Sequence, residues 1–186
     1  LKSGCQIDNI GMQYHIYSDV DDVDYEGLNK RFDFVNLYRA MNLYAKFGKK
    51  LQISEISVFG HDEALQAELI EKLYKIWFSH PAVESITYWN AGDNGSILID
   101  GWNERKFRCG LYDENFRKKE SFNVLDNLIN KEWRTDLEIE TKHDHCYFKA
   151  FHGNYDIEVI ANGVKTKRNI NLLKNGPEEF YFVMDN

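Results

Sequence analysis

Residues 51–59 read Leu-Gln-Ile-Ser-Glu-Ile-Ser-Val-Phe, an apolar strand pattern with a single acid, Glu55, at its centre. Successive side chains of an extended strand point to opposite faces, which predicts that Ile53, Glu55 and Ser57 share one face. The opposite face would then hold Gln52, Ser54, Ile56 and Val58. The strand taken alone fits a sheet edge with Glu55 in water, and the stretches around it are what favour a functional acid.

Strand and helix patterns alternate on both sides of this segment. Two further short apolar stretches, residues 9–17 and 83–90, flank it, and amphipathic helix patterns over residues 33–47 and 62–78 lie between the three. A last helix pattern covers about residues 121–132. This alternation predicts an α/β fold with a parallel sheet, whose chemistry lies at the C-terminal ends of the strands.

Polar and aromatic groups gather at the ends of the two flanking strands. Gln13 and His15 fall on one face of residues 9–17, and the opposite face is apolar. The third strand ends at Trp89 and leads into residues 91–109, a loop of the length that tends to be functional or disordered. Taken alone, His15 is more simply interpreted as a hydrogen-bonded core histidine than as a site residue.

The sequence pattern changes at Trp133, after which short segments of alternating apolar and polar residues follow one another. Asn162-Gly163 between two of them is a strong hairpin signal. We therefore predict an α/β domain over residues 1–133 and a small antiparallel, β-sandwich-like accessory module over residues 134–186. Its expected strands cover residues 136–141, 146–151, 155–161, 164–172 and 179–184.

Composition restricts the partners of this chain. Its 186 residues include 23 basic and 30 acidic side chains, a net charge of −7, which argues against a nucleic acid or an anionic membrane as partner. No run approaches the roughly 20 apolar residues of a membrane helix, and residues 1–4 lack the apolar core of a secretory signal. We expect the chain to begin inside a longer protein.

Neither a metal nor another cofactor is predicted. Cys5, Cys109 and Cys146 are widely spaced and odd in number, so we expect thiols, with one disulfide as the alternative. His143 and His145 could share a strand face, but two ligands are too few for a metal site.

Four motifs resemble, in order and spacing, the last three strand–helix units of glycoside hydrolase family 10, a family of retaining endo-β-1,4-xylanases on a (β/α)8 barrel. The resemblance covers about residues 4–133. It implies that the fold is the C-terminal portion of a TIM barrel, followed by the small β-module. The motifs are Ile10-Gly-Met-Gln-Tyr-His15, Ile53-Ser-Glu-Ile-Ser57, Ser79-His-Pro-Ala-Val83 with Ile86-Thr-Tyr-Trp89, and Gly110-Leu-Tyr-Asp-Glu-Asn115.

The resemblance implies a role for each site residue. Glu55 would be the catalytic nucleophile and His15 its hydrogen-bond partner. Gln13, Trp89 and Asn90 would bind substrate, with the Trp89 ring as a floor for the sugar. These roles agree with chemistry, because a retaining glycosidase needs one ionised carboxylate for attack and one protonated carboxyl group about 5 to 5.5 Å away. An imidazole that donates to Glu55 would keep it ionised, and sugar C–H groups pack well on an aromatic ring.

The chain also departs from the family pattern. Ser57 stands in place of the usual Asp, Asn90 in place of Gly, and Ile97 where a second tryptophan commonly covers the substrate. Lys118 and Glu120 replace the prolines before the last helix. The loss of a stacking tryptophan weakens or reshapes the sugar cleft, so the substrate is less firmly implied than the glycosidase class.

A complete (β/α)8 barrel takes about 250 residues, and here about 130 supply three strands and three helices. The Asn-Glu pair that carries the family's acid/base lies on an earlier strand. Asn103-Glu104 occurs in the loop after Trp89, a position that argues against this role. We therefore predict the C-terminal part of a xylanase-like enzyme acting on xylan, inactive without the N-terminal half of its barrel. The alternatives are a non-catalytic carbohydrate-binding module and a structural half-barrel. The family implies secretion or a cell-envelope location.

Overall fold

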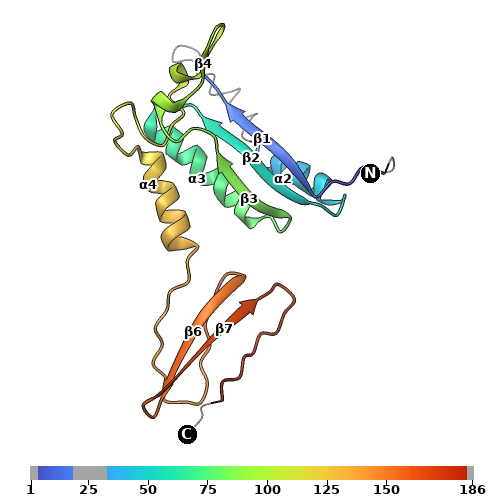
Figure 1. The fold of residues 1–186 in the computed structure, drawn as a ribbon, viewed down its shortest axis with the longest axis vertical. Coiled ribbons are helices and arrows are strands. Elements are labelled where there is room, and N and C mark those ends of the chain that lie inside the picture. Colours follow the sequence, from blue (N-terminus) through green and yellow to red (C-terminus); the bar gives the residue numbers. More distant parts are fainter. Residues whose placement is uncertain (1–3, 19–32, 184–186) are drawn as a thin grey trace. The chain divides into compact units, whose positions relative to one another are not determined.

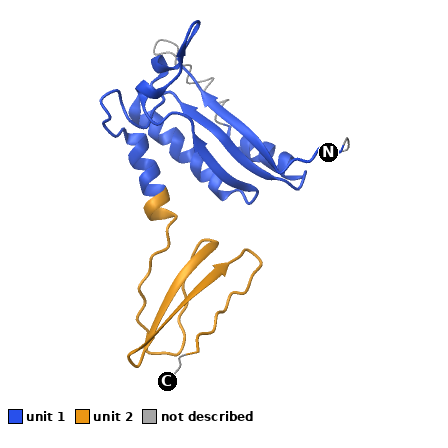
Figure 2. Cartoon of the chain, viewed as in Figure 1, with its two compact units in different colours: residues 1–128 blue, residues 129–186 orange. Residues whose placement is uncertain are grey.

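The computed structural model describes residues 4–18 and 33–183. The chain divides into two compact units, residues 1–128 and residues 129–186 (Figure 2). The sequence places this boundary slightly later, after residue 133. The difference arises because the last helical turn, Leu128–Glu132, widens into a π-helix in which only Leu128 is buried.

Unit 1 is built on a three-stranded parallel sheet, as the alternating pattern predicts. Its strands β1 (Asn9–Ile16), β2 (Lys50–Val58) and β3 (Val83–Tyr88) lie in sequence order (Figure 1). Helix α2 (Phe34–Ala45) connects the first two strands and α3 (Glu63–Ser79) the next two. Helix α4 (Glu120–Asn127) follows the long loop after β3.

Local signals explain where the helices begin. The side chain of Asp33 accepts a hydrogen bond from the Asn36 backbone N–H at 3.0 Å, and Asp62 accepts one from Leu65 at 3.0 Å. Each aspartate thus satisfies a backbone donor that the first helical turn leaves without a partner. The core then forms where α3 packs on the sheet, and its fully buried members include Leu51, Ile53, Ile56, Val58, Ile70, Leu73 and Trp77.

A β-bulge in β2 corrects the predicted division of its faces. The pairing of β1 with β2 shifts between Met12 and Gln13, whose partners are Ile53 and Glu55, so Ser54 is the extra residue. Because a bulge resets the alternation, Ile53 does not share a face with Glu55 as predicted. Instead it is buried with Ile56, while Glu55 lies on the polar face.

The long loop after β3 is ordered by short elements. It contains η2 (Asp93–Gly95), the two-residue strands β4 (Leu98–Ile99) and β5 (Trp102–Asn103), and η3 (Glu104–Phe107). β4 and β5 pair antiparallel as a small hairpin, which the sequence did not predict.

Unit 2 contains β6 (Gly153–Ala161) and β7 (Val164–Leu172), paired as an antiparallel hairpin. Asn162 and Gly163 join them with φ angles of 52° and 79°, which confirms the hairpin signal. The other predicted strands cover residues 136–141, 146–151 and 179–184. Residue 184 lies outside the described residues, and the rest of these segments are not strands. Their alternation favours an extended backbone, but a strand also needs a partner for its hydrogen bonds, and that partner is a tertiary choice.

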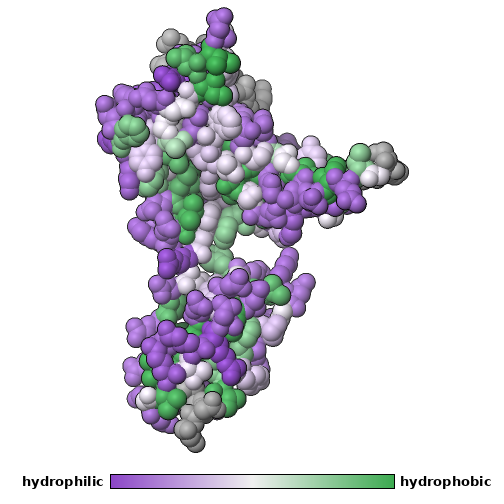
Figure 3. Space-filling view, viewed as in Figure 1, coloured by the Kyte–Doolittle hydropathy of each residue, from purple (hydrophilic) through white to green (hydrophobic). Residues whose placement is uncertain are grey.

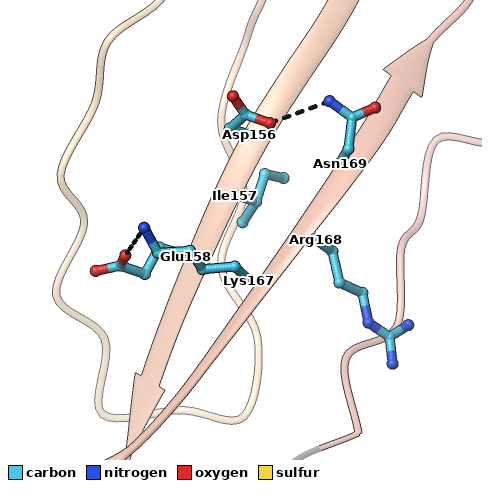
Figure 4. A pocket seen from close by; sticks show the side chains of 6 residues that line it. All are labelled: Asp156, Ile157, Glu158, Lys167, Arg168 and Asn169. Atoms are coloured by element: carbon cyan, nitrogen blue, oxygen red, sulfur yellow. Dashed lines mark hydrogen bonds and ion pairs between the residues drawn. The ribbon is translucent and has the colours of Figure 1, made fainter.

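The hairpin of unit 2 carries a charged surface hollow (Figure 4). Its groups largely satisfy one another: Asp156 accepts from Asn169 at 3.1 Å, and Glu158 pairs with Lys167 at 3.1 Å. Over the ranges that the structure describes, no helix is both long and apolar enough to cross a bilayer. Nor do those residues include a group of three or more His, Cys, Asp or Glu that could hold a metal ion.

Candidate active site

Gln13, His15 and Glu55 meet on the polar face of the β1–β2 pair. Gln13 Nε2 donates to Glu55 Oε1 at 2.9 Å, and His15 Nε2 lies 3.1 Å from Glu55 Oε2. Both oxygens of the carboxylate are therefore held, while the Glu55 side chain remains 24% exposed. The two contacts fix the orientation of a carboxylate that stays partly exposed.

The second ring nitrogen of His15 faces hydroxyl groups. His15 Nδ1 lies 3.1 Å from Ser57 Oγ and 3.3 Å from the Tyr17 hydroxyl. A carboxylate only accepts, so the contact with Glu55 places a proton on Nε2, and a hydroxyl can then donate to Nδ1 of a neutral ring. An aspartate at position 57 could only accept a hydrogen bond from Nδ1, whereas the Ser57 hydroxyl can also donate one.

Trp89 lies beside this group and also contacts a second cluster, to which Asn90 belongs. The Trp89 ring is 39% exposed and stands edge-on to His15, with ring centroids 6.2 Å apart. Asn90 is only 6% exposed, and its amide donates to Glu104 Oε2 at 3.3 Å. Of the five residues predicted for the site, the structure thus brings four together and places Asn90 in a second cluster.

That second cluster surrounds Glu104, at the start of η3. Glu104 is 5% exposed, and its Oε1 accepts from Tyr17 at 3.0 Å and Trp102 at 3.3 Å. Its Oε2 accepts from Trp89 at 3.2 Å and from Asn90. Burial by itself would raise the pKa of this carboxyl, but the hydrogen bonds from Asn90, Tyr17, Trp102 and Trp89 together lower it. Glu104 is therefore ionised at neutral pH and holds no proton to donate as a general acid.

Tyr17 joins the two clusters. Its ring stacks on His15 with centroids 5.6 Å apart and an interplanar angle of 7°, and its hydroxyl donates to Glu104. Burial is the main cause that raises the pKa of Tyr17, so the hydroxyl keeps its proton. Sequence reasoning missed this residue, although Gln13, His15 and Tyr17 follow one another at strand spacing on one face.

A buried ion pair anchors the loop that carries Glu104. Lys119 is fully buried, and its ammonium group donates to the Arg108 carbonyl oxygen at 2.6 Å and lies 3.5 Å from Asp93 Oδ1. The backbone N–H of Gly110 donates to the same Asp93 oxygen at 2.8 Å. At Gly60, just past β2, a Cβ would lie 2.2 Å from the Arg108 carbonyl oxygen, so only glycine permits this close approach.

The fold and the site together define an α/β protein with a three-stranded parallel sheet and an oriented carboxylate on its polar face. The sequence profile described as glycosyl hydrolase family 10 matches residues 1–128. The chain therefore belongs to glycosyl hydrolase family 10, as its motifs indicate.

Two similar proteins extend over different parts of the chain. Anti-sigma-I factor RsgI6 of Acetivibrio thermocellus is 27% identical over 94% of this chain, which spans 20% of that protein. The other is the solved structure of the CBM22-1-GH10 modules of Clostridium thermocellum endo-1,4-β-D-xylanase 10B, complexed with xylohexaose. It matches 66% of this chain and 23% of its own with 19% identity and a TM-score of 0.51, a likeness of fold. The chain thus spans about a fifth of the length of each of these two proteins.

Proposed function

We propose that residues 1–133 are the last three strand–helix units of a retaining endo-β-1,4-xylanase-like glycoside hydrolase that acts on xylan. Glu55 is the nucleophile, and the observation that carries this role is the pair of hydrogen-bond contacts, from Gln13 and His15, to its two oxygens. Membership of the family supports the hydrolase class. The xylanase whose fold is similar was solved with xylohexaose, which supports xylan as the substrate.

The chemistry needs a second carboxyl group from outside these strands. In the first step, Glu55 would attack the anomeric carbon and form a covalent glycosyl-enzyme, while a protonated acid assists departure of the leaving-group oxygen. Glu104 is ionised and already accepts four hydrogen bonds, so it does not suit that task. The acid/base would come from the N-terminal half of the barrel, and the complete enzyme would work outside the cell or at its envelope without a cofactor.

A second candidate is a non-catalytic part that binds a glycan with the same residues. The relative that matches 94% of this chain, unit 2 included, is named as an anti-sigma-I factor and not as an enzyme. Gln13 and Trp89 could hold a sugar in such a protein without cleaving it.

Replacement of the Glu55 carboxylate tests both candidates. In the complete protein, Glu55→Gln should lower xylan turnover by several orders of magnitude, because an amide is a poor nucleophile. Its affinity for xylohexaose should stay close to that of the parent. Glu84→Gln is the matched control, since Glu84 is a carboxylate on the neighbouring strand β3 that also accepts from a glutamine, at 2.8 Å.

Three outcomes are informative. Turnover by Glu55→Gln within about tenfold of the parent would remove Glu55 from the nucleophile role. A parent that binds xylohexaose without hydrolysing it would favour the second candidate. A parent that neither binds nor hydrolyses it would exclude both.

A further inference from the structure

Trp102 lies on the β4–β5 hairpin, at a place the family pattern does not assign. The hairpin begins directly after Ile97, which stands where a second substrate-covering tryptophan is usual. Trp102 pairs with Ile99 across the hairpin and is 42% exposed, close to the 39% of Trp89. The chain therefore presents two partly exposed indole rings at the end of its sheet, even though it lacks the usual second one.

One buried carboxylate holds both of these rings. Trp89 donates its indole N–H to Glu104 Oε2 at 3.2 Å, and Trp102 donates to Oε1 at 3.3 Å. An indole has a single N–H donor, so each ring is fixed by its only polar atom. What each indole can still offer a ligand is its apolar ring surface.

Packing holds Trp102 against Tyr17, the ring that also stacks on His15. Its ring stands edge-on to Tyr17, with centroids 5.7 Å apart, and tilted against Phe107 at 5.9 Å. Tyr17 in turn stacks on His15. A rigid ring costs little conformational entropy when a ligand packs on it, and this one is already fixed by two aromatic neighbours and a hydrogen bond.

The surroundings of Trp102 favour an apolar, uncharged ligand surface. Ile97, Leu98 and Ile99 are 37%, 55% and 63% exposed, and hydrophobic side chains gather in Figure 3 over the position that β4 holds in Figure 1. The net charge of −7 disfavours an anionic ligand. Sugar rings of a neutral glycan present C–H groups to an aromatic face and direct their hydroxyls to water.

Resting on the proposed function, we infer that Trp102 is a further carbohydrate-binding residue, a second aromatic platform for a neutral β-1,4-linked oligosaccharide. Glu104 is the positioning residue that orients both platforms.

The test compares affinities in the complete protein carrying Glu55→Gln, so that turnover does not interfere. Xylohexaose and cellohexaose are titrated by calorimetry into this protein and into versions that also carry Trp102→Ala or Glu104→Gln. Each variant should bind about tenfold more weakly, since stacking on one platform is lost or misdirected. Asp100→Asn, in the same hairpin, is the matched control and should bind as the parent does.

A second measurement needs no destabilising variant. With ¹⁵N-labelled indoles, the Trp102 signal, assigned by its absence in Trp102→Phe, should shift as xylohexaose or cellohexaose is added to the Glu55→Gln protein. A purely structural tryptophan would keep its signal. Trp102→Ala affinities within about twofold of the parent, or an unchanged Trp102 signal under saturating ligand, would overturn the inference.

The outcomes separate this inference from the xylanase proposal. Binding of cellohexaose that depends on Trp102, in a protein that neither binds xylohexaose nor cleaves xylan, would support the platform and reject the xylan assignment. Xylan turnover, together with oligosaccharide affinity that does not depend on Trp102, would support the xylan assignment and reject the platform. Binding of neither oligosaccharide would reject both.

Discussion

Glu55 and Glu104 are carboxylates of two clusters that Tyr17 joins, and their surroundings differ. Glu55 keeps 24% of its side chain exposed, whereas Glu104 is buried and accepts four hydrogen bonds. Those bonds favour the ionised form of Glu104 and lower its pKa in the folded chain below the usual 4.5. Its charge therefore stabilises the fold fully above that usual value, and the contribution is lost as the pH falls through the folded value.

This linkage predicts how the stability of the protein responds to acid. Between about pH 5 and pH 3, the free energy of unfolding should fall more steeply for the parent than for Glu104→Gln, which has no proton to gain there. Denaturant titrations at a series of pH values measure both curves. Asp100→Asn serves as the control for a lost acidic group, because Asp100 is exposed, and its curve should follow that of the parent. Parallel curves for the parent and Glu104→Gln would contradict the prediction.

Among the elements, the β6–β7 hairpin lies outside the unit that carries the site. It forms its own two-stranded sheet around the Asn162-Gly163 turn, and Glu158 pairs across the strands with Lys165 at 2.7 Å and Lys167 at 3.1 Å. Its hydrogen bonds and ion pairs are thus largely internal, which is typical of an accessory unit.

Removal of residues 134–186 from the complete protein should accordingly leave the hydrolytic reaction largely unchanged. Turnover of a small soluble xylo-oligosaccharide should stay within about tenfold of the parent, because no proposed catalytic group is removed. Thermal stability or binding to insoluble xylan should decrease. Circular dichroism establishes that the shortened protein is folded, and a folded protein without turnover would show that this unit does supply a catalytic group.

At the scale of the whole molecule, three parallel strands cannot form a closed barrel. In the sheet of unit 1, β1 and β3 are the outer strands, so within the described residues each presents one side of its backbone without a strand partner. Such edges pair readily with other chains, and barrels remove them by closure. The polar face around Glu55 likewise has no opposing wall from these strands to exclude water.

We therefore expect the 186-residue chain alone to self-associate and not to hydrolyse xylo-oligosaccharides. Acid–base assistance is commonly worth about 10² to 10⁴ in rate, and the missing cleft removes positioning as well. Activity and molecular mass are compared for the chain purified alone and co-expressed with the N-terminal half of the barrel. Equal activity in the two preparations would place a general acid within this chain.

Much of this architecture could be predicted from the sequence because its signals are local. Asp33 and Asp62 cap the helices they precede, and Asn162-Gly163 forms the turn it predicts. In each case the backbone groups that need partners lie within a few residues of the signal. The strand periodicity likewise predicts that Gln13 and His15 share one polar face, and the family motifs predict that Glu55 belongs to the same site.

The remaining features depend on partners far apart in the chain. The bulge at Ser54 is set by the register between β1 and β2, and it moved Ile53 into the core. The carboxylate of Glu104 reaches Tyr17 across 87 positions of sequence, a contact that no local pattern encodes. Whether residues 136–151 form strands likewise depends on whether another strand lies beside them to share backbone hydrogen bonds. The sequence thus determined which residues could form helices, turns and a polar strand face, while only the tertiary structure decided which distant groups satisfied one another, because pairing over long separations depends on the whole packed chain.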